Sequence, residues 1–154
     1  MTSFRKIIER YGGFENSSLD DLFGALLRKD IEDFKMEYEQ IILTCTSFHD
    51  GSPENAYHML FLGMCVYLNG DYRVSSNIER GHGRADIVLE ARHAGSPNFV
   101  IEFKQGEDIS QLAQEAIAQI KDKKYYAGLK GETVLLGIAH NLKACQVVSE
   151  TKVL

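Results

Sequence analysis

Residues 83–104 constrain the fold of this chain more than any other stretch, because they predict two β-strands joined by a polar turn. Branched and aromatic side chains are frequent in residues 84–91 and again in residues 98–104, as expected of paired strands. Between them, the sequence His-Ala-Gly-Ser-Pro at 93–97 has turn chemistry: the glycine permits unusual φ values and the proline begins the second strand. The sequence therefore predicts an antiparallel hairpin.

The predicted hairpin brings charged side chains together at its open end. If the turn is centred near Ala94, Asp86 lies across from Glu102. Side chains alternate between the two faces of a strand, so Lys104 shares a face with Glu102. The register therefore predicts that two carboxylates and a lysine converge.

Such a cluster has a chemical use. Two adjacent carboxylates repel, and each raises the pKa of the other unless a cation neutralises them. Mg²⁺ binds oxygen ligands and keeps several waters for chemistry. A nearby lysine can orient or deprotonate a metal-activated water, or stabilise developing phosphate charge. The alternative is that Glu102 and Lys104 are only the solvated face of an antiparallel sheet. The presence of Asp86 at the facing position of the other strand favours the metal site, but it does not by itself decide between the two interpretations.

The bulk properties are those of one globular domain. The chain has 154 residues, of which 44% are hydrophobic and 25% charged. The longest apolar run, residues 59–68, is too short to span a bilayer, and the first residues do not resemble a signal peptide. Cys45, Cys65 and Cys145 are odd in number, far apart and in apolar surroundings, which indicates reduced core thiols. We therefore expect a cytoplasmic protein without a membrane partner.

The formal net charge is −5. This charge argues against a protein that binds nucleic acid through global basicity. It does not exclude a metal-dependent phosphodiesterase, because the carboxylates and the bound metal set the local field in such a site.

Helices are expected before the hairpin, over residues 2–11, 17–27, 30–44 and 53–68. Glu54 and His58 are four residues apart and share a face near the amino end of the last helix. By themselves they are better explained as a charge favoured by the helix dipole and a hydrogen-bonded core histidine.

A long helix is expected after the hairpin, capped by Asp108 or Ser110 and ending before Gly128. Gln119 and Lys123 share one face of it. A local basic patch, formed by Lys121, Lys123 and Lys124, is typical of a solvated helix end, with phosphate contact as the alternative. Further strands are expected over residues 72–78, 133–139 and 144–150, the last at a sheet edge.

Several segments together resemble the PD-(D/E)XK nuclease superfamily, and more closely the nuclease-like domain at the carboxyl end of predicted AAA-type ATPases. The matching segments are ALLRKDIEDF (25–34), SPENAYHMLFLGM (52–64), SNIERGHGRADIVL (76–89), VIEFK (100–104) and AIAQIKDKKYYAGL (116–129). Ala85 replaces the proline that gives the superfamily its name, at a position that varies widely. The 154 residues contain no ATPase domain, so an ATPase partner or a fused ATPase domain is an expectation from the resemblance alone.

The resemblance implies a restriction-endonuclease-like α/β fold, with a mixed sheet of about five strands flanked by helices on both faces. Residues 1–48 would form a helical amino-terminal segment packed on a nuclease-like core of residues 49–154, in one globular domain overall. The resemblance also implies roles for individual residues. Metal ligands would be Glu54, Asp86, Glu102 and the backbone carbonyl of Phe103. Lys104 would assist the attacking water, and Gln119 and Tyr125 would support the site.

Two functions follow as hypotheses. The first is an Mg²⁺-dependent nuclease, with Mn²⁺ able to substitute, that hydrolyses phosphodiester bonds of nucleic acid, with DNA favoured. Arg84, Lys123 and Tyr125 would then contact the nucleic acid, although Arg84 could equally pair with Glu79. The second is a non-catalytic interaction module that retains the fold and binds a protein or nucleic acid. The acidic net charge favours the second hypothesis. The complete set of carboxylates and lysine favours the first, because buried like charges destabilise the fold and are not expected unless they serve a function.

Overall fold

The computed structural model describes residues 16–44, 56–141 and 144–154. The chain divides into two compact units, one comprising residues up to Tyr67 with 142–144, and the other residues 68–141 with 145–154. The division expected from the sequence at residue 48 remains a prediction. In the described part of the chain, no helix is long and apolar enough to cross a membrane.

The first unit contains helices α2 (Asn16–Leu27), α3 (Ile31–Thr44) and α4 (Ala56–Cys65). The helices expected over 17–27 and 30–44 are confirmed, and the one expected over 53–68 is present from Ala56, with a short 3₁₀ turn over Val66–Leu68. The helix expected over 2–11 lies outside the described residues, as does Pro53.

Aromatic rings fill the core of the first unit. Phe34 stacks on Tyr38 at 5.9 Å between ring centroids, and both rings meet Phe61 edge-on. Phe23 also contacts Phe61 edge-on at 6.0 Å. These residues come from three different helices, so the apolar stripes of the sequence pack against one another inside this unit.

The second unit is a five-stranded mixed sheet with one helix. Its elements are β1 (Tyr72–Arg80), β2 (Gly83–Ala91), β3 (Asn98–Gln105), α5 (Ile109–Lys123), β4 (Glu132–His140) and β5 (Cys145–Val153). The strand order follows the chain, β1-β2-β3-β4-β5. Only β3 and β4 are parallel, because α5 forms the crossover between them, and the other neighbours are antiparallel. The α/β architecture and the edge position of the last strand are confirmed.

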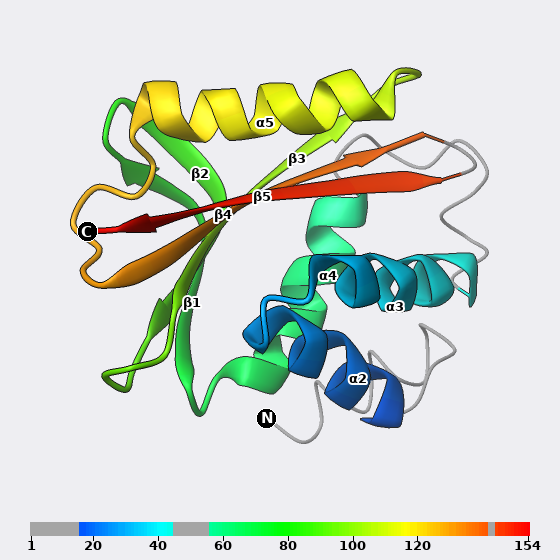
Figure 1. The fold of residues 1–154 in the computed structure, drawn as a ribbon, viewed down its shortest axis with the longest axis horizontal. Helices are drawn as coiled ribbons and strands as arrows, with labels where there is room; N and C mark the ends of the chain where they lie inside the picture. Colours follow the sequence, from blue (N-terminus) through cyan, green and yellow to red (C-terminus); the bar gives the residue numbers. More distant parts are fainter. Residues whose placement is uncertain (1–15, 45–55, 142–143) are drawn as a thin grey trace. The chain divides into compact units, whose positions relative to one another are not determined.

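Helix α5 packs along one face of this sheet, against β3, β4 and β5 (Figure 1). The helix begins at Asp108, whose side chain accepts a hydrogen bond from the backbone N–H of Gln111 at 3.1 Å. Gly137 of β4 permits the close approach of the helix, because a Cβ atom there would lie 2.4 Å from the backbone oxygen of Ala113.

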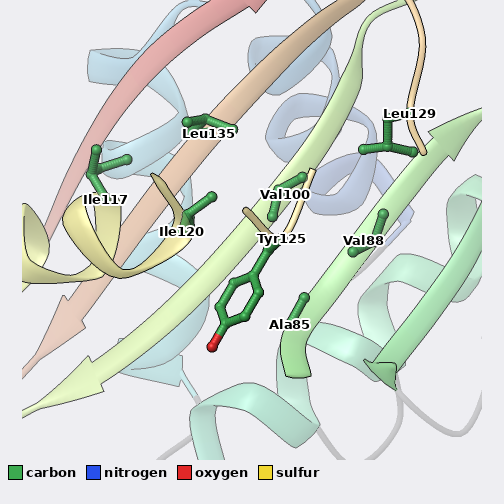
Figure 2. Packing of buried hydrophobic residues seen from close by; sticks show 8 residues of the cluster. All are labelled: Ala85, Val88, Val100, Ile117, Ile120, Tyr125, Leu129 and Leu135. Atoms are coloured by element: carbon green, nitrogen blue, oxygen red, sulfur yellow. The ribbon is translucent and has the colours of Figure 1, made fainter. Parts of the chain in front are cut away.

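A continuous apolar cluster joins α5 to the sheet. Figure 2 shows it: Ala85, Val88, Val100, Ile117, Ile120, Tyr125, Leu129 and Leu135. Val88 of β2, Val100 of β3 and Leu135 of β4 are each fully buried. Since side chains alternate along a strand, Glu102 lies on the same face of β3 as Val100, which is the face that α5 covers.

A buried asparagine fixes the start of β3. The side-chain oxygen of Asn98 accepts a hydrogen bond from the backbone N–H of Ala91, and its nitrogen donates to the backbone carbonyl of Lys130, both at 2.9 Å. Nearby, the hydroxyl of Tyr72 donates to the carbonyl of Pro97 at 2.6 Å. These bonds hold the turn of the β2–β3 hairpin to the neighbouring segments.

Two of the cysteines were correctly expected to be reduced core residues. Within the described residues, Cys65 and Cys145 are buried and form no disulfide. Burial raises the pKa of the Cys65 thiol above its usual range, so this thiol stays protonated. Cys45 lies outside the described residues.

Candidate active site

The register of the β2–β3 hairpin places Asp86 and Glu102 in facing positions. Backbone pairing joins Leu89 to Phe99 and Ile87 to Ile101, and then stops. One step further along both strands, the facing residues are Asp86 and Glu102, as the predicted turn near Ala94 requires. The open end of the hairpin is therefore where the two carboxylates lie.

Side chains replace the backbone pairing at this point. The Oδ2 atom of Asp86 accepts a hydrogen bond from the backbone N–H of Phe103 at 2.8 Å. In the other direction, the backbone N–H of Asp86 donates to Oε2 of Glu102 at 3.4 Å. Each carboxylate thus binds the backbone of the opposite strand, which keeps the two acids side by side at the point where regular pairing ends.

Glu102 is in an environment that disfavours its charge. Its side chain is buried, with 5% relative exposure. Burial is the main cause that raises the pKa of Glu102 to about 8, and the charge of Asp86 raises it further, while Lys104 acts in the opposite direction. A buried acid of this kind gains stability in its ionised form when a cation binds beside it.

Gln119 connects the helix to both charged groups of β3. Its side-chain oxygen accepts a hydrogen bond from Nζ of Lys104. Its side-chain nitrogen donates to Oε1 of Glu102 and to the hydroxyl of Tyr125, each at 3.0 Å. The amide therefore holds the lysine and the carboxylate in fixed relative positions.

A comparison with protein families shows which family the chain belongs to. A model described as the PD-(D/E)XK nuclease superfamily matches residues 52–150. The chain belongs to this superfamily. A search of curated proteins finds no match. Among solved structures, the crystal structure of SSO0001 is similar at 16% identity with a TM-score of 0.34, over 98% of this chain and 76% of that one. This likeness is too weak to support any inference.

The structure brings together most of the site residues that the PD-(D/E)XK resemblance implied. Asp86, Glu102, Lys104, Gln119 and Tyr125 form one connected set of hydrogen bonds. Their assigned roles remain predictions. Glu54 lies outside the described residues, so its expected place beside Asp86 also remains a prediction.

The residues expected to contact nucleic acid differ in exposure. Arg84 is exposed and lies 3.5 Å from Glu79, the pairing that the sequence left open. Lys123 is exposed, whereas Tyr125 is buried at 3% relative exposure. Tyr125 therefore offers its hydroxyl to the site rather than an open aromatic surface.

The donor set is suited to a hard divalent cation. Asp86 and Glu102 supply carboxylate oxygens, and each oxygen that accepts a hydrogen bond keeps a second lone pair. Within the described ranges, no group of three or more His, Cys, Asp or Glu side chains is close enough to hold a metal ion. A complete shell therefore needs a further oxygen, for which the expected sources are Glu54 and the backbone carbonyl of Phe103.

Sequence reasoning missed the way in which the acids are held. The backbone N–H of Phe103 as a partner of Asp86 carries no signal in the sequence, because any residue except proline has that group. Sequence reasoning also missed His140, which is buried on β4 and stacks on Phe103 with 6.0 Å between ring centroids. Burial lowers the pKa of His140 to about 3, so it is a neutral packing residue.

Proposed function

We propose that this chain is a metal-dependent nuclease that hydrolyses phosphodiester bonds of nucleic acid. The observation that carries the proposal is the reciprocal bonding of Asp86 and Glu102, each to the backbone of the other's strand, with Lys104 linked to Glu102 through Gln119. Two carboxyl groups held together in this way, one of them buried, are both ionised near neutral pH only when a cation offsets their charges.

Each residue has a distinct role in this proposal. Asp86, Glu102, Glu54 and the carbonyl of Phe103 would hold Mg²⁺ or Mn²⁺, which would polarise the phosphate and lower the pKa of a bound water. Lys104 would orient the attacking water and offset the negative charge that develops on the phosphate. Gln119 is a positioning residue, since it accepts from Lys104 and donates to Glu102.

The partners and the location are also proposals. We expect DNA to be the preferred substrate over RNA, and we expect Arg84 and Lys123 to contact it. An ATPase partner, or an ATPase domain in the same polypeptide, rests on the resemblance of the segments quoted above. A cytoplasmic location is expected from the reduced, buried thiols of Cys65 and Cys145.

The acidic net charge of −5 favours a second function, a non-catalytic module that keeps the nuclease fold. The two proposals differ in metal binding and in hydrolysis. Wild-type protein and Asp86→Asn should be incubated with labelled DNA and RNA, with Mg²⁺, Mn²⁺ or EDTA. A nuclease cleaves only with metal and loses cleavage in Asp86→Asn, whereas an interaction module cleaves under none of these conditions.

A further inference from the structure

A rigid basic surface lies next to the candidate site. It consists of exposed side chains from the β1–β2 turn and from the carboxyl end of α5, and is called here the basic ridge: His82, Arg84, Lys123 and Lys124. The backbone N–H of His82 donates to the carbonyl of Lys123 at 2.8 Å, which joins the two segments. Figure 1 shows the same meeting of the green hairpin with the end of the yellow helix.

The turn and the helix end fit closely. Gly81 has φ of +59°, and a Cβ atom there would lie 2.2 Å from the carbonyl oxygen of Lys123. Only glycine satisfies both conditions without a shift of the backbone. Behind the turn, the guanidinium of Arg80 donates to the carbonyl of Ala127 at 2.9 Å. Hydrogen bonds and close packing therefore hold the backbone segments that carry the side chains of the ridge.

Lys124 adds an independent observation. It caps α5 in the left-handed conformation, with φ 52° and ψ 47°, and its N–H bonds the carbonyls of Ile120 and Lys121. Glycine is the residue that helices most often place in this conformation, because a Cβ atom makes it unfavourable. A strained lysine at the surface, where glycine would be more stable, is consistent with a use for its charge.

The ridge is connected to the catalytic residues. A Cβ atom on Gly83 would lie 3.0 Å from the ring of Tyr125, so the start of β2 lies against the hydroxyl-bearing end of that ring. Tyr125 accepts from Gln119, which donates to Glu102. Figure 2 shows the Tyr125 ring beside Ala85, the second residue after Gly83.

The acids near the ridge do not neutralise it. Arg84 lies 3.5 Å from Glu79, and both side chains are well exposed, so water weakens this pair. Asp122 is exposed on α5 and carries one compensating charge. Lys121 is outside the ridge because it pairs with Glu150 at 3.1 Å.

We propose that the basic ridge binds the phosphodiester backbone of the nucleic acid beyond the scissile phosphate. The inference rests on the proposed function and deepens it: the substrate is a polynucleotide strand that continues past Tyr125 onto the β1–β2 turn, not a single nucleotide. Phosphate contacts of this kind are independent of base sequence and weaken with added salt.

The test measures binding without cleavage. A fluorescein-labelled 20-nucleotide single strand is titrated with the full chain in EDTA at several salt concentrations, and binding is followed by anisotropy. The variants are Arg84→Gln, Lys123→Gln and Lys124→Gly. The matched control is Lys130→Gln, an exposed lysine whose backbone carbonyl binds Asn98 near Ala91, at the other end of β2 from Gly83.

We expect each ridge variant to weaken binding several-fold and to reduce the slope of log K against log salt by about 0.7, the value for one lost contact to a single strand. Lys130→Gln should match the wild type. Lys124→Gly should melt at the same temperature or higher, because it relieves the left-handed lysine, so its weaker binding is not a folding defect.

The proposal is overturned if the ridge variants bind as the wild type does, if Lys130→Gln loses as much affinity, or if the chain binds poly-glutamate and not the oligonucleotide. The result is separable from the catalytic proposal. If the ridge binds the strand but the protein does not cleave it in Mn²⁺, the ridge proposal is supported and the nuclease proposal is refuted. If the protein cleaves the strand and none of the three ridge variants changes cleavage, the nuclease proposal is supported and the ridge proposal is refuted.

Discussion

At the scale of single residues, Gln119 is the side chain on which the site geometry depends. Its amide bonds Lys104 and Glu102 at once. We expect Gln119→Ala to lower metal-dependent cleavage about 10- to 100-fold, the usual cost of removing a group that orients a metal ligand. The control is Gln114→Ala, an exposed glutamine on the same helix, which should leave the rate unchanged. Equal cleavage rates for both variants would contradict the positioning role proposed for Gln119.

The second residue-scale prediction concerns pH. The pKa of Glu102 is raised from 4.5 to about 8 in the folded protein, so folding binds its proton more tightly. Its contribution to stability is complete below pH 4.5 and is lost as pH rises through about 8. His140 acts oppositely: its pKa is lowered from 6.5 to about 3, so its contribution is complete above pH 6.5 and is lost as pH falls.

Between pH 6.5 and 8, Glu102 changes its contribution to the free energy of unfolding and His140 does not, so the two contributions can be distinguished there. In EDTA, the melting temperature of the wild type should fall across this interval, and that of Glu102→Gln should fall less. Melting curves collected in half-unit steps of pH measure the difference. Parallel curves for the two proteins would show that Glu102 titrates normally in the folded state.

At the scale of elements, the position of α5 on the sheet controls both stability and the site. Gly137→Ala would put a Cβ atom 2.4 Å from the carbonyl oxygen of Ala113, which forces the helix away from β4. Gly137 pairs with Glu102 in the sheet, and α5 carries Gln119, so the same shift separates Gln119 from its partners. We expect overpacking to lower the free energy of unfolding by about 1–3 kcal/mol, seen as a lower melting temperature, together with reduced cleavage.

The control for this prediction is Ala118→Gly, at an exposed position of α5. It costs about 1 kcal/mol through helix propensity but leaves the helix in place. Its cleavage rate below the melting temperature should equal that of the wild type. If Gly137→Ala loses stability and keeps full cleavage, the spacing between α5 and β4 does not control the site.

At the scale of the whole molecule, short-range patterns predicted the individual helices and strands, whereas the mixed sheet of about five strands was expected from the resemblance to the PD-(D/E)XK superfamily. Alternation along residues 84–91 and 98–104, with a turn of defined length, was enough to place Asp86 opposite Glu102. A long helix after the hairpin was also expected, with Asp108 or Ser110 as its cap, and the structure has Asp108 in that position. These signals are local, and they are repeated along each element.

The remaining features could not be predicted, because they depend on contacts between distant residues or on a local backbone conformation that is unusual for the residue concerned. The bond from Phe103 to Asp86 spans 17 positions and involves a backbone group. The bond from Asn98 to Lys130 spans 32 positions. The left-handed Lys124 follows from the helix end, where the sequence has lysine instead of the usual glycine. The spacing of apolar and polar residues along the sequence does not predict such features.

Calorimetric titration with Mn²⁺ tests the central claim most directly, because it asks whether Asp86 and Glu102 form a cation site. The account predicts saturable binding by the wild type, loss of binding in Asp86→Asn, and no loss of stability in that variant, since asparagine keeps an oxygen that can accept from Phe103. Ile101→Ala, on the buried opposite face of β3, should instead cost about 2–5 kcal/mol of stability and leave Mn²⁺ binding intact while folded. A wild type that binds no Mn²⁺, with Asp86→Asn melting as low as Ile101→Ala, would contradict the account.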